Sequence, residues 1–527
     1  MAEELGTSER EIVAQRQRKA EALRALGVNP WGNGHTPRHL AADLLSRYGQ
    51  QPAEEIARDP GSWSVAGRVL AVRSFGKAAF LKVRDRSGDI QVWVKKDKVG
   101  DRGFEIYKLL DVGDIVAAEG PATRTKTGEL TVEAATFTIL TKSVHPLPEK
   151  WHGLADVEAR YRQRYVDLAV TPGVRETFVR RARIVTTIRR FLDERGYLEV
   201  ETPTLHRPEE AGGAAARPFE THHNALGLDL KLRIATELHL KRLVVGGLER
   251  VYEIGRIWRN EGIDRRHNPE FTSIEFYQAY ATHEDLMALT EQLLHRLAVE
   301  VTGSAVVKFQ GQEIDLTPPY PRVSLLAEGA KALGLPVEEA LAGKGLAEAL
   351  ARAAARENAS EDAWKLEQVA QRSPGEILAA AFEIFGEKQL PKDRPAFVVD
   401  FPIETSPLSR RRDADPRLVD RFELFVAGME VANAFSELND PADQRARFEA
   451  QVKARAAGDE EAMPYDEDYV RALEIGMPPT AGEGIGIDRV AMLLTDSASI
   501  RDVILFPLLK PRAAAQPGDE GPGGKPE

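Results

Sequence analysis

The sequence contains no cysteine among its 527 residues. Disulfide bonds, thiol catalysis and zinc sites with cysteine ligands are therefore excluded. The sequence also has no His-Glu-x-x-His pattern and no Gly-x-x-x-x-Gly-Lys-Ser/Thr stretch. We therefore expect neither a zinc-protease helix nor a phosphate-binding P-loop.

Long apolar runs are absent as well. No stretch approaches the roughly 20 apolar residues that a membrane-spanning helix requires, and the acidic start, Met1-Ala2-Glu3-Glu4, is followed by no apolar segment. We expect a soluble, cytoplasmic protein with no membrane partner. The formal net charge of −11 argues against a protein that coats nucleic acid nonspecifically, so no DNA partner is expected. Any contact with RNA must come from local patches.

The length and the composition, 43% hydrophobic and 29% charged, are typical of a globular chain with two or three domains. Turn signals and shifts in composition predict an order of parts along the chain. These parts are an N-terminal helical extension (1–60), a small strand-rich domain (61–145), a linker (146–157), a large domain (158–511) that contains an alanine-rich helical insertion at about 325–372, and a disordered tail (512–527).

Residues 8–26 predict a helix that ends before Gly27. Its charged residues, which include Arg16 and Lys19, are expected to be solvated, and contact with RNA is the less favoured alternative.

Five strand-like runs follow in the small domain, which suits an OB-fold barrel, a platform for single-stranded nucleic acid. Phe75, Phe80 and Trp93 are candidate surfaces for base stacking, although most aromatic side chains of a small barrel pack in its core. The runs are 63–72, 79–85, 90–95, 115–123 and 130–140.

In the large domain, Ile184, Ile188, Phe191 and Leu192 form an apolar stripe at helical spacing. Gly196 ends the helix, and a strand then runs into Pro203. An ordinary amphipathic helix explains this pattern equally well.

Residues 256–277 predict two strands joined by a charged loop. Side chains alternate faces along a strand, so Arg259 converges with Phe271, Glu275 and Tyr277. An arginine can bind a phosphate bidentately, an aromatic ring can stack on a purine, and a carboxylate can bind a cationic group. The pattern therefore favours a site for a nucleotide and a cationic substrate, although a charged hairpin is more often simply solvated.

Gly482, Gly484 and Gly486 leave one face of a further strand without side chains, so that a flat ligand can lie against it. Arg489 follows three residues later. The glycine pattern alone is a weak signal.

Taken together and in this order, the three segments resemble motifs 1, 2 and 3 of the class II aminoacyl-tRNA synthetases; the core of motif 2 is Arg259 and Glu261. The resemblance is to the bacterial lysyl enzymes in particular, and it runs from about residue 60 to Pro511. It implies an α+β protein that has a five-stranded OB-fold β-barrel and a class II catalytic domain built on an antiparallel sheet flanked by helices. Because motif 1 forms the dimer interface in that family, a homodimer is implied.

The resemblance also assigns site residues. It places Arg259 on the ATP α-phosphate and adenine between Phe271 and Arg489, and it makes Arg259, Glu261 and Arg489 the catalytic set. Glu423 and Glu430 take the Mg2+ positions, for which a bulge or coil near Val431 would be needed. The implied ATP-binding residues are Arg259, Glu261, Arg266, His267, Phe271 and Arg489, with Arg266 and His267 toward the β- and γ-phosphates.

For the amino acid, a mostly acidic lining favours lysine and repels aspartate. Glu275 and Glu437 face its ε-ammonium, and Glu237 faces its α-ammonium. The implied lysine-binding residues are Gly213, Glu237, Glu275, Tyr277, Asn433, Phe435 and Glu437. In the barrel, Phe80 and Gln91 are the implied anticodon-binding residues.

The expected reaction has two steps: ATP and L-lysine form lysyl-adenylate, and the lysyl group then passes to the 3′ end of tRNA(Lys). Three alternatives remain open: a ligase that places lysine on a protein, an aspartyl or asparaginyl enzyme, and a catalytically silent RNA-binding relative. Glu483, where an apolar residue is common, and Ala434, where glycine is expected, depart from the family pattern, as does the acidic segment 207–211.

Overall fold

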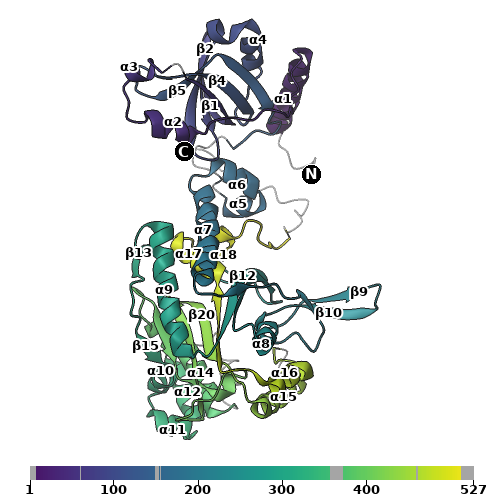
Figure 1. Ribbon diagram of the computed structural model, residues 1–527, viewed down its shortest axis with the longest axis vertical. Helices are drawn as coiled ribbons and strands as arrows, with labels where there is room; N and C mark the ends of the chain where they lie inside the picture. The colour runs from purple at the N-terminus through teal and green to yellow at the C-terminus, as the bar shows by residue number, and fades with distance from the viewer. Residues whose placement is uncertain are drawn as a thin grey trace. The chain divides into compact units, whose positions relative to one another are not determined.

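The computed structural model describes residues 7–59, 61–148, 154, 156–356, 372–458 and 461–511. The chain divides into two compact units, Met1–Pro172 and Gly173–Glu527, whose elements are labelled in Figure 1. Within the described residues, no helix has both the length and the apolar character needed to cross a membrane.

The first unit is built on a closed sheet with the strand order β1-β2-β3-β5-β4-β6, which β1 closes by pairing with β4. Its strands are β1 (Ser62–Phe75), β2 (Ala78–Arg84), β3 (Asp89–Lys95), β4 (Ile115–Arg124), β5 (Leu130–Ala134) and β6 (Thr136–Thr141), and its helices are α1 (Thr7–Ala25), α2 (Ala41–Tyr48), α3 (Ala53–Ile56), α4 (Lys96–Lys108), α5 (Val157–Arg162) and α6 (Arg164–Val170).

The fifth expected strand, 130–140, is two strands, so the prediction of a single run there was wrong. β5 pairs with one end of β4, and β6 pairs with the other end. The chain changes direction at Ala135, opposite Gly120. A Cβ at Gly120 would lie 1.9 Å from the carbonyl oxygen of Glu133, so this break requires glycine on the neighbouring strand.

The predicted N-terminal helix is confirmed as α1, but two of its charged side chains are not solvated. Arg16 is buried and donates to the carbonyl oxygens of Ser143 and His145. Lys19 Nζ lies 2.7 Å from Asp111 Oδ1. These contacts attach the helix to the barrel.

The second unit contains an eight-stranded sheet, mainly antiparallel, with the order β15-β16-β19-β20-β21-β12-β11-β7. The strands of the whole unit, which also form smaller sheets, are β7 (Leu198–Glu199), β8 (Leu205–His206), β9 (Glu220–His223), β10 (Leu228–Leu232), β11 (Arg250–Trp258), β12 (Glu270–Ala279), β13 (Val306–Phe309), β14 (Gln312–Asp315), β15 (Arg322–Ser324), β16 (Ala396–Val399), β17 (Phe401–Pro402), β18 (Leu418–Val419), β19 (Arg421–Val426), β20 (Met429–Ser436) and β21 (Thr480–Gly486).

Helices α7 and α9 cover one face of this sheet (Figure 1). The predicted stripe on α7 is confirmed, because Ile184, Ile188, Phe191 and Leu192 are all at most 1% exposed. The helices of the unit are α7 (Val174–Asp193), α8 (Glu237–Val245), α9 (His283–Thr302), α10 (Leu325–Leu333), α11 (Val337–Leu341), α12 (Leu346–Arg356), α14 (Pro374–Ala381), α15 (Pro441–Ala456), α16 (Glu467–Gly476), α17 (Ile487–Leu494) and α18 (Ile500–Val503).

The expected insertion at 325–372 is helical where the structure describes it, in α10, α11 and α12, which share an apolar core with α14. Residues 357–371 lie outside the described residues. The expected tail, 512–527, and half of the expected linker, residues 149–153 and 155, also lie outside them.

Glu483, on β21, is a buried carboxyl on the core face of the sheet. It is 1% exposed, and burial raises its pKa to about 8 from an ordinary value of 4.5. Thr290 Oγ1 lies 2.6 Å from Glu483 Oε1 and 2.7 Å from the carbonyl oxygen of Leu286. A protonated Glu483 can donate to Thr290 while the Thr290 hydroxyl donates to Leu286, so the neutral acid satisfies this chain.

We predict that Glu483→Gln stabilises the protein above neutral pH. The folded state keeps a proton that the unfolded chain releases above about pH 4.5, so wild-type stability falls as the pH rises from there through about 8. Glutamine does not titrate, and the variant should gain on the order of 3 kcal/mol at pH 8.5 and little at pH 5. Urea unfolding of both proteins across this range measures the gain. The prediction is wrong if the free energies of unfolding of the wild type and the variant change with pH in the same way.

Candidate active site

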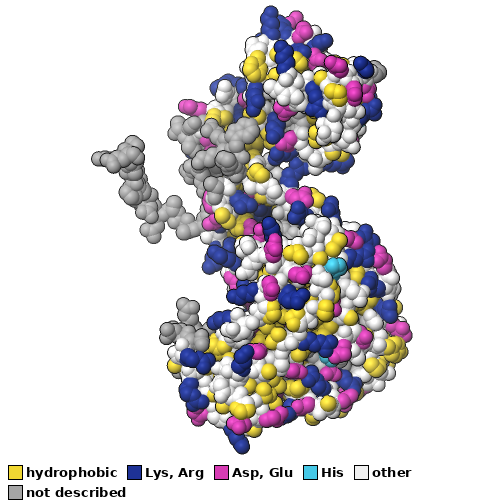
Figure 2. Space-filling model, turned by 90° about the vertical axis from the view of Figure 1, so that its left-hand side faces the viewer, with side chains coloured by type: hydrophobic (Ala, Val, Ile, Leu, Met, Phe, Trp, Pro, Cys, Tyr) yellow, Lys and Arg dark blue, Asp and Glu magenta, His cyan; other side chains and the backbone are white. Residues whose placement is uncertain are grey.

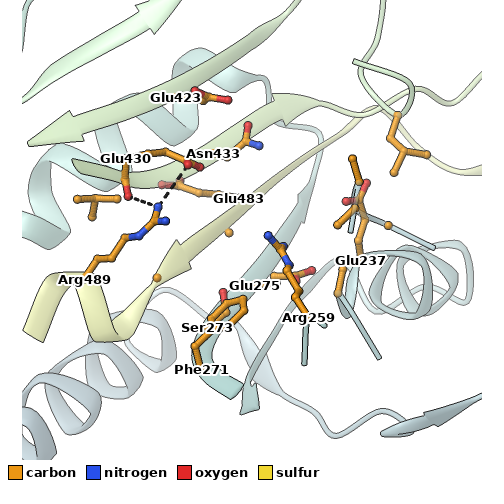
Figure 3. Close-up of a pocket in the computed structure, with 18 of the residues that line it drawn as sticks. Glu237, Arg259, Phe271, Ser273, Glu275, Glu423, Glu430, Asn433, Glu483 and Arg489 are labelled. Atoms are coloured by element: carbon orange, nitrogen blue, oxygen red, sulfur yellow. Dashed lines mark hydrogen bonds and ion pairs between the residues drawn. The ribbon is translucent and has the colours of Figure 1, made fainter. Parts of the chain in front are cut away.

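A cavity of about 430 Å³ opens on the face of the sheet away from α7 and α9. Strand alternation places its residues there: on β12, Ile274 and Phe276 point into the core, whereas Ser273, Glu275 and Tyr277 line the cavity. In Figure 3, Arg489 and Glu430 lie at one end of the site and Glu237 at the other, with Arg259 and Glu275 between them.

Gly482, Gly484 and Gly486 form part of the cavity floor on β21. A Cβ at Gly482 would lie 2.2 Å from the Tyr277 ring and 2.3 Å from Glu437 Oε1. The first glycine of the pattern is therefore needed because two side chains approach the backbone closely there.

Arg259 follows the end of β11, and its guanidinium carbon lies 5.3 Å from the centre of the Phe271 ring. Its Nε is buried and has no hydrogen-bond partner within the residues that the structure describes. A buried donor without a partner is costly, so this arginine is suited to receive an anionic ligand.

Arg489 lies at the opposite end of the cavity. Its Nη1 donates to the backbone oxygen of Glu430 at 2.6 Å and lies 3.3 Å from Glu430 Oε2. Its Nη2 is 3.3 Å from His267 Nε2, and Arg266 donates to the carbonyl oxygen of Gly428. The loop residues Arg266 and His267 thus reach this end, together with Glu261 at the cavity rim. Adenine was expected between Phe271 and Arg489. In this structure the Phe271 ring faces Arg259, and Arg489 is hydrogen-bonded to Glu430.

Glu423 on β19 and Glu430 on β20 both line the cavity. Leu424 pairs with Ala432 and Phe425 pairs with Glu430, so Val431 is an extra residue on β20. The expected bulge near Val431 is confirmed, and it turns Glu430 toward the same cavity as Glu423. Burial, reinforced by the charge of Glu430, raises the pKa of Glu423 to about 7 although Arg421 opposes the shift.

The other end of the cavity is acidic. Glu275 accepts hydrogen bonds from the backbone N–H of Thr236 at 3.1 Å and from the Tyr277 hydroxyl at 3.4 Å. Burial raises its pKa to about 7, and Glu237 adds to the shift. In the part of the chain that the structure describes, no cationic side chain forms an ion pair with Glu275. A cationic ligand would therefore stabilise the ionised form of this carboxyl.

Glu437 was expected beside Glu275 in the lining, but it is not among the lining residues. It is 1% exposed and forms an ion pair with Lys241, and its Oε1 lies beside the Tyr277 ring, where a Cβ of Gly482 would be. Lys241 also binds Glu237, with Nζ 2.5 Å from Oε1.

The remaining residues expected to bind the amino acid line the cavity. Gly213 has a φ of +94°, a conformation that favours glycine, and a Cβ there would lie 3.0 Å from that of Ala235. Asn433 Oδ1 accepts from Arg421 Nε at 3.1 Å, which leaves its amide nitrogen available. Phe435 lies two residues beyond Asn433 on β20, on the same face of the strand.

The candidate anticodon-binding residues lie on neighbouring strands of the barrel, Phe80 on β2 and Gln91 on β3. Phe80 is stacked on Trp93 with ring centres 5.0 Å apart, and the Phe75 ring, 62% exposed, lies 6.1 Å from that of Phe80. Gln91 accepts a hydrogen bond from Thr131. On the face drawn in Figure 2, basic and acidic side chains are interspersed.

Comparisons with known proteins match both units. A family model described as tRNA synthetases class II (D, K and N) matches residues 156–510, more than half of the chain. The chain belongs to the class II tRNA synthetases. A second model, described as OB-fold nucleic acid binding domain, matches residues 63–140 of this synthetase. The predicted α+β architecture with an OB-fold barrel is thereby confirmed.

Relatives of this synthetase match it over almost its whole length. The lysine–tRNA ligase of Anaeromyxobacter sp. (strain K) is 84% identical over 512 residues, which cover 97% of this chain and 100% of the relative. The lysine–tRNA ligase of Moorella thermoacetica is 50% identical over 505 residues, 96% of this chain and 99% of the relative. That of Thermoanaerobacter sp. (strain X514) is 49% identical over 503 residues, 95% and 96%.

Sequence reasoning missed two basic residues of the synthetase site. Lys241 lies four residues after Glu237 on α8, a spacing that brings opposite charges together on a helix. Arg421 lies two residues before Glu423 on β19, on the same face of the strand, and binds it at 2.6 Å. Both spacings are visible in the sequence and could have revealed these pairs.

Proposed function

We propose that this class II synthetase attaches L-lysine to tRNA(Lys) in two ATP-dependent steps. The observation that carries the proposal is the acidic end of the cavity, where Glu275 has no cationic partner among the described residues and Glu237 lies beside it. The relatives at 84% and 50% identity bear the name lysine–tRNA ligase, which agrees with a pocket for a cationic amino acid.

In the first step, the lysine carboxylate attacks the ATP α-phosphate, and lysyl-adenylate and pyrophosphate form. Arg259 would bind the α-phosphate and the lysine carboxylate, with Asn433 beside it, and Phe271 would stack on adenine. The leaving phosphates would be bound by Arg489, Arg266 and His267. For this, Arg489 would release its contacts with Glu430 and bind ATP instead. No side chain becomes covalently attached, so catalysis rests on positioning and on electrostatic stabilisation. In the second step, a hydroxyl of the tRNA 3′-terminal ribose attacks the carbonyl carbon of lysyl-adenylate, so that the lysyl ester forms and AMP leaves.

Glu423 and Glu430 fit a Mg2+ site. Two carboxylates supply the oxygen ligands that Mg2+ prefers, and substrate phosphates commonly complete its coordination. Burial, and to a smaller extent the charge of Glu430, raises the pKa of Glu423, and a bound cation would oppose both effects. Bound there, Mg2+ would neutralise charge on the phosphates of ATP.

The barrel would bind the tRNA anticodon through Phe80 and Gln91. We predict that Phe80→Ala raises the KM for tRNA by about tenfold, because stacking of one base on an aromatic ring contributes about 1–3 kcal/mol. Lysine-dependent ATP–pyrophosphate exchange does not involve tRNA and should be unchanged. Aminoacylation kinetics with purified tRNA measure both effects, and an unchanged KM for tRNA would remove Phe80 from the anticodon site.

A homodimer and a cytoplasmic location complete the proposal. Motif 1 comprises α7 and β7, and each exposes an apolar side chain, Val179 at 51% and Leu198 at 51%. Because β7 is the edge strand of the sheet, this edge offers a surface for a second copy. Sedimentation velocity of the purified protein measures the oligomeric state.

The alternatives fit less well. A ligase acting on a protein has no need for an anticodon-binding barrel, which this chain has. A silent relative would have lost motif residues, whereas Arg259, Glu261, Glu423, Glu430 and Arg489 all line the cavity. An aspartyl or asparaginyl enzyme is disfavoured by Glu237 and Glu275.

Pyrophosphate exchange with lysine, aspartate and asparagine in parallel tests the proposal. Exchange with lysine alone is expected. Exchange driven by aspartate or asparagine would overturn the assignment of the amino acid.

A further inference from the structure

Lys241 is a fully buried cation behind the amino-acid end of the cavity. Its side chain is 0% exposed, and its Nζ contacts Glu237 Oε1 and Glu437 Oε2. The rings of Phe435 and Tyr469 lie 5.3 and 5.9 Å from the same nitrogen. Burying an ammonium group is costly unless anions and good geometry compensate, and here two carboxylates share one lysine.

The two carboxylates reach Lys241 from different elements. Glu237 begins α8, four residues before Lys241, whereas Glu437 follows β20 and is fixed by a backbone hydrogen bond from its N–H to the carbonyl oxygen of Thr480. Lys241 therefore joins the helix that supplies one wall of the pocket to the sheet that supplies its floor.

Lys241 contacts one oxygen of each carboxylate and leaves the other oxygen uncontacted. Glu237 lines the cavity directly. Glu437 Oε1 has no partner among the described residues and lies against Gly482, a residue of the cavity floor. Lys241 thus holds one oxygen of Glu437 and leaves the other for a donor that arrives with the substrate.

The charges at this end match a dication. Glu237, Glu275 and Glu437 carry three negative charges when ionised, and in the described part of the chain Lys241 is the cation paired with them. An excess of two negative charges remains. L-Lysine has two ammonium groups, while its carboxylate faces Arg259.

We propose that Lys241 is a positioning residue for amino-acid selection. By binding Glu237 and Glu437 together, it fixes the carboxylates that meet the α- and ε-ammonium groups and sets the pocket charge to suit a substrate with two of them. This inference rests on the proposed function and names the residue that acts through both carboxylates.

The test is a double-mutant cycle on lysine-dependent pyrophosphate exchange, with wild type, Lys241→Met, Glu437→Gln and the double variant. Lys241→Met should raise the KM for lysine roughly 100-fold, as expected when one member of a buried ion pair is removed. The KM for ATP should stay within about threefold, because Lys241 is not near the phosphate end. The double variant should be no worse than Lys241→Met, since Lys241 acts through Glu437.

Arg242→Met is the matched control. Arg242, the next residue on α8, forms an ion pair with the buried Asp466, away from the pocket, and its loss should leave the KM for lysine within about threefold. If Lys241→Met does not fold, Lys241→Gln keeps one hydrogen-bond donor and enters the same cycle with the same expectation.

Two results would overturn the inference: equal rises in the KM for lysine and for ATP, which indicate a purely structural role, or additive effects of the two substitutions on the KM for lysine. Absence of lysine-dependent exchange in the wild type would instead refute the proposed function, so the two failures are distinguishable.

Discussion

Arg259→Ala is expected to reduce lysine-dependent ATP–pyrophosphate exchange by at least about 1,000-fold. Removal of one neutral donor from a stabilising site costs about 100- to 1,000-fold in rate, and a charged, two-pronged donor contributes more. Arg259 lies in the cavity above Phe271, and its Nε has no partner among the described residues. The change should therefore alter the free energy of unfolding by less than about 1 kcal/mol.

Two further variants sharpen this result. Arg259→Lys keeps the charge but not the planar fork, and it should recover only a small part of the activity. Arg256→Ala is the matched control, because Arg256 lies on β11, three residues before Arg259, and is 3.5 Å from the exposed Glu270; it should keep most of the activity. Exchange retained by Arg259→Ala would remove Arg259 from the mechanism.

Glu275→Gln is expected to weaken lysine binding by about 10- to 100-fold at pH 8, because a charge-assisted hydrogen bond contributes about 1.5–3 kcal/mol. The wild type should itself lose affinity at lower pH. Glu275 has a pKa of about 7 in the free protein, so below pH 7 it is increasingly protonated and cannot pair with an ammonium group. Lysine affinity should then fall toward tenfold per pH unit.

Isothermal titration calorimetry of lysine binding between pH 6 and 8.5 measures both effects. Glutamine does not titrate, so the advantage of the wild type over the variant should shrink by about tenfold between pH 8 and pH 6 as Glu275 is protonated. A flat profile for the wild type, or a variant with undiminished affinity at pH 8, would mean that Glu275 does not bind the substrate.

Short-range periodicity in the sequence was sufficient to predict which side chains share a face on individual strands and helices. The period-two alternation of β12 places Ser273, Glu275 and Tyr277 on one face, and the helical stripe of α7 is buried as predicted. The need for a bulge or coil near Val431 followed from the same alternation, since Glu430 is otherwise out of phase with the residues that follow it on the strand.

What the sequence could not supply depends on how distant segments meet. The sharing of Lys241 by Glu237 and Glu437 requires α8 and the end of β20 to approach each other, and no local pattern encodes that distance. The fifth barrel strand divides where its register against β4 shifts by one residue, between the Val132–Ala122 and Thr136–Glu119 pairs, and a continuous run of strand formers does not reveal such a shift.

Charging of total tRNA with labelled lysine, aspartate or asparagine, each with ATP and Mg2+, measures which amino acid the protein attaches. Lysine alone should become attached to tRNA as an alkali-labile ester. Attachment of aspartate or asparagine, or activation of lysine without any charged tRNA, would contradict it.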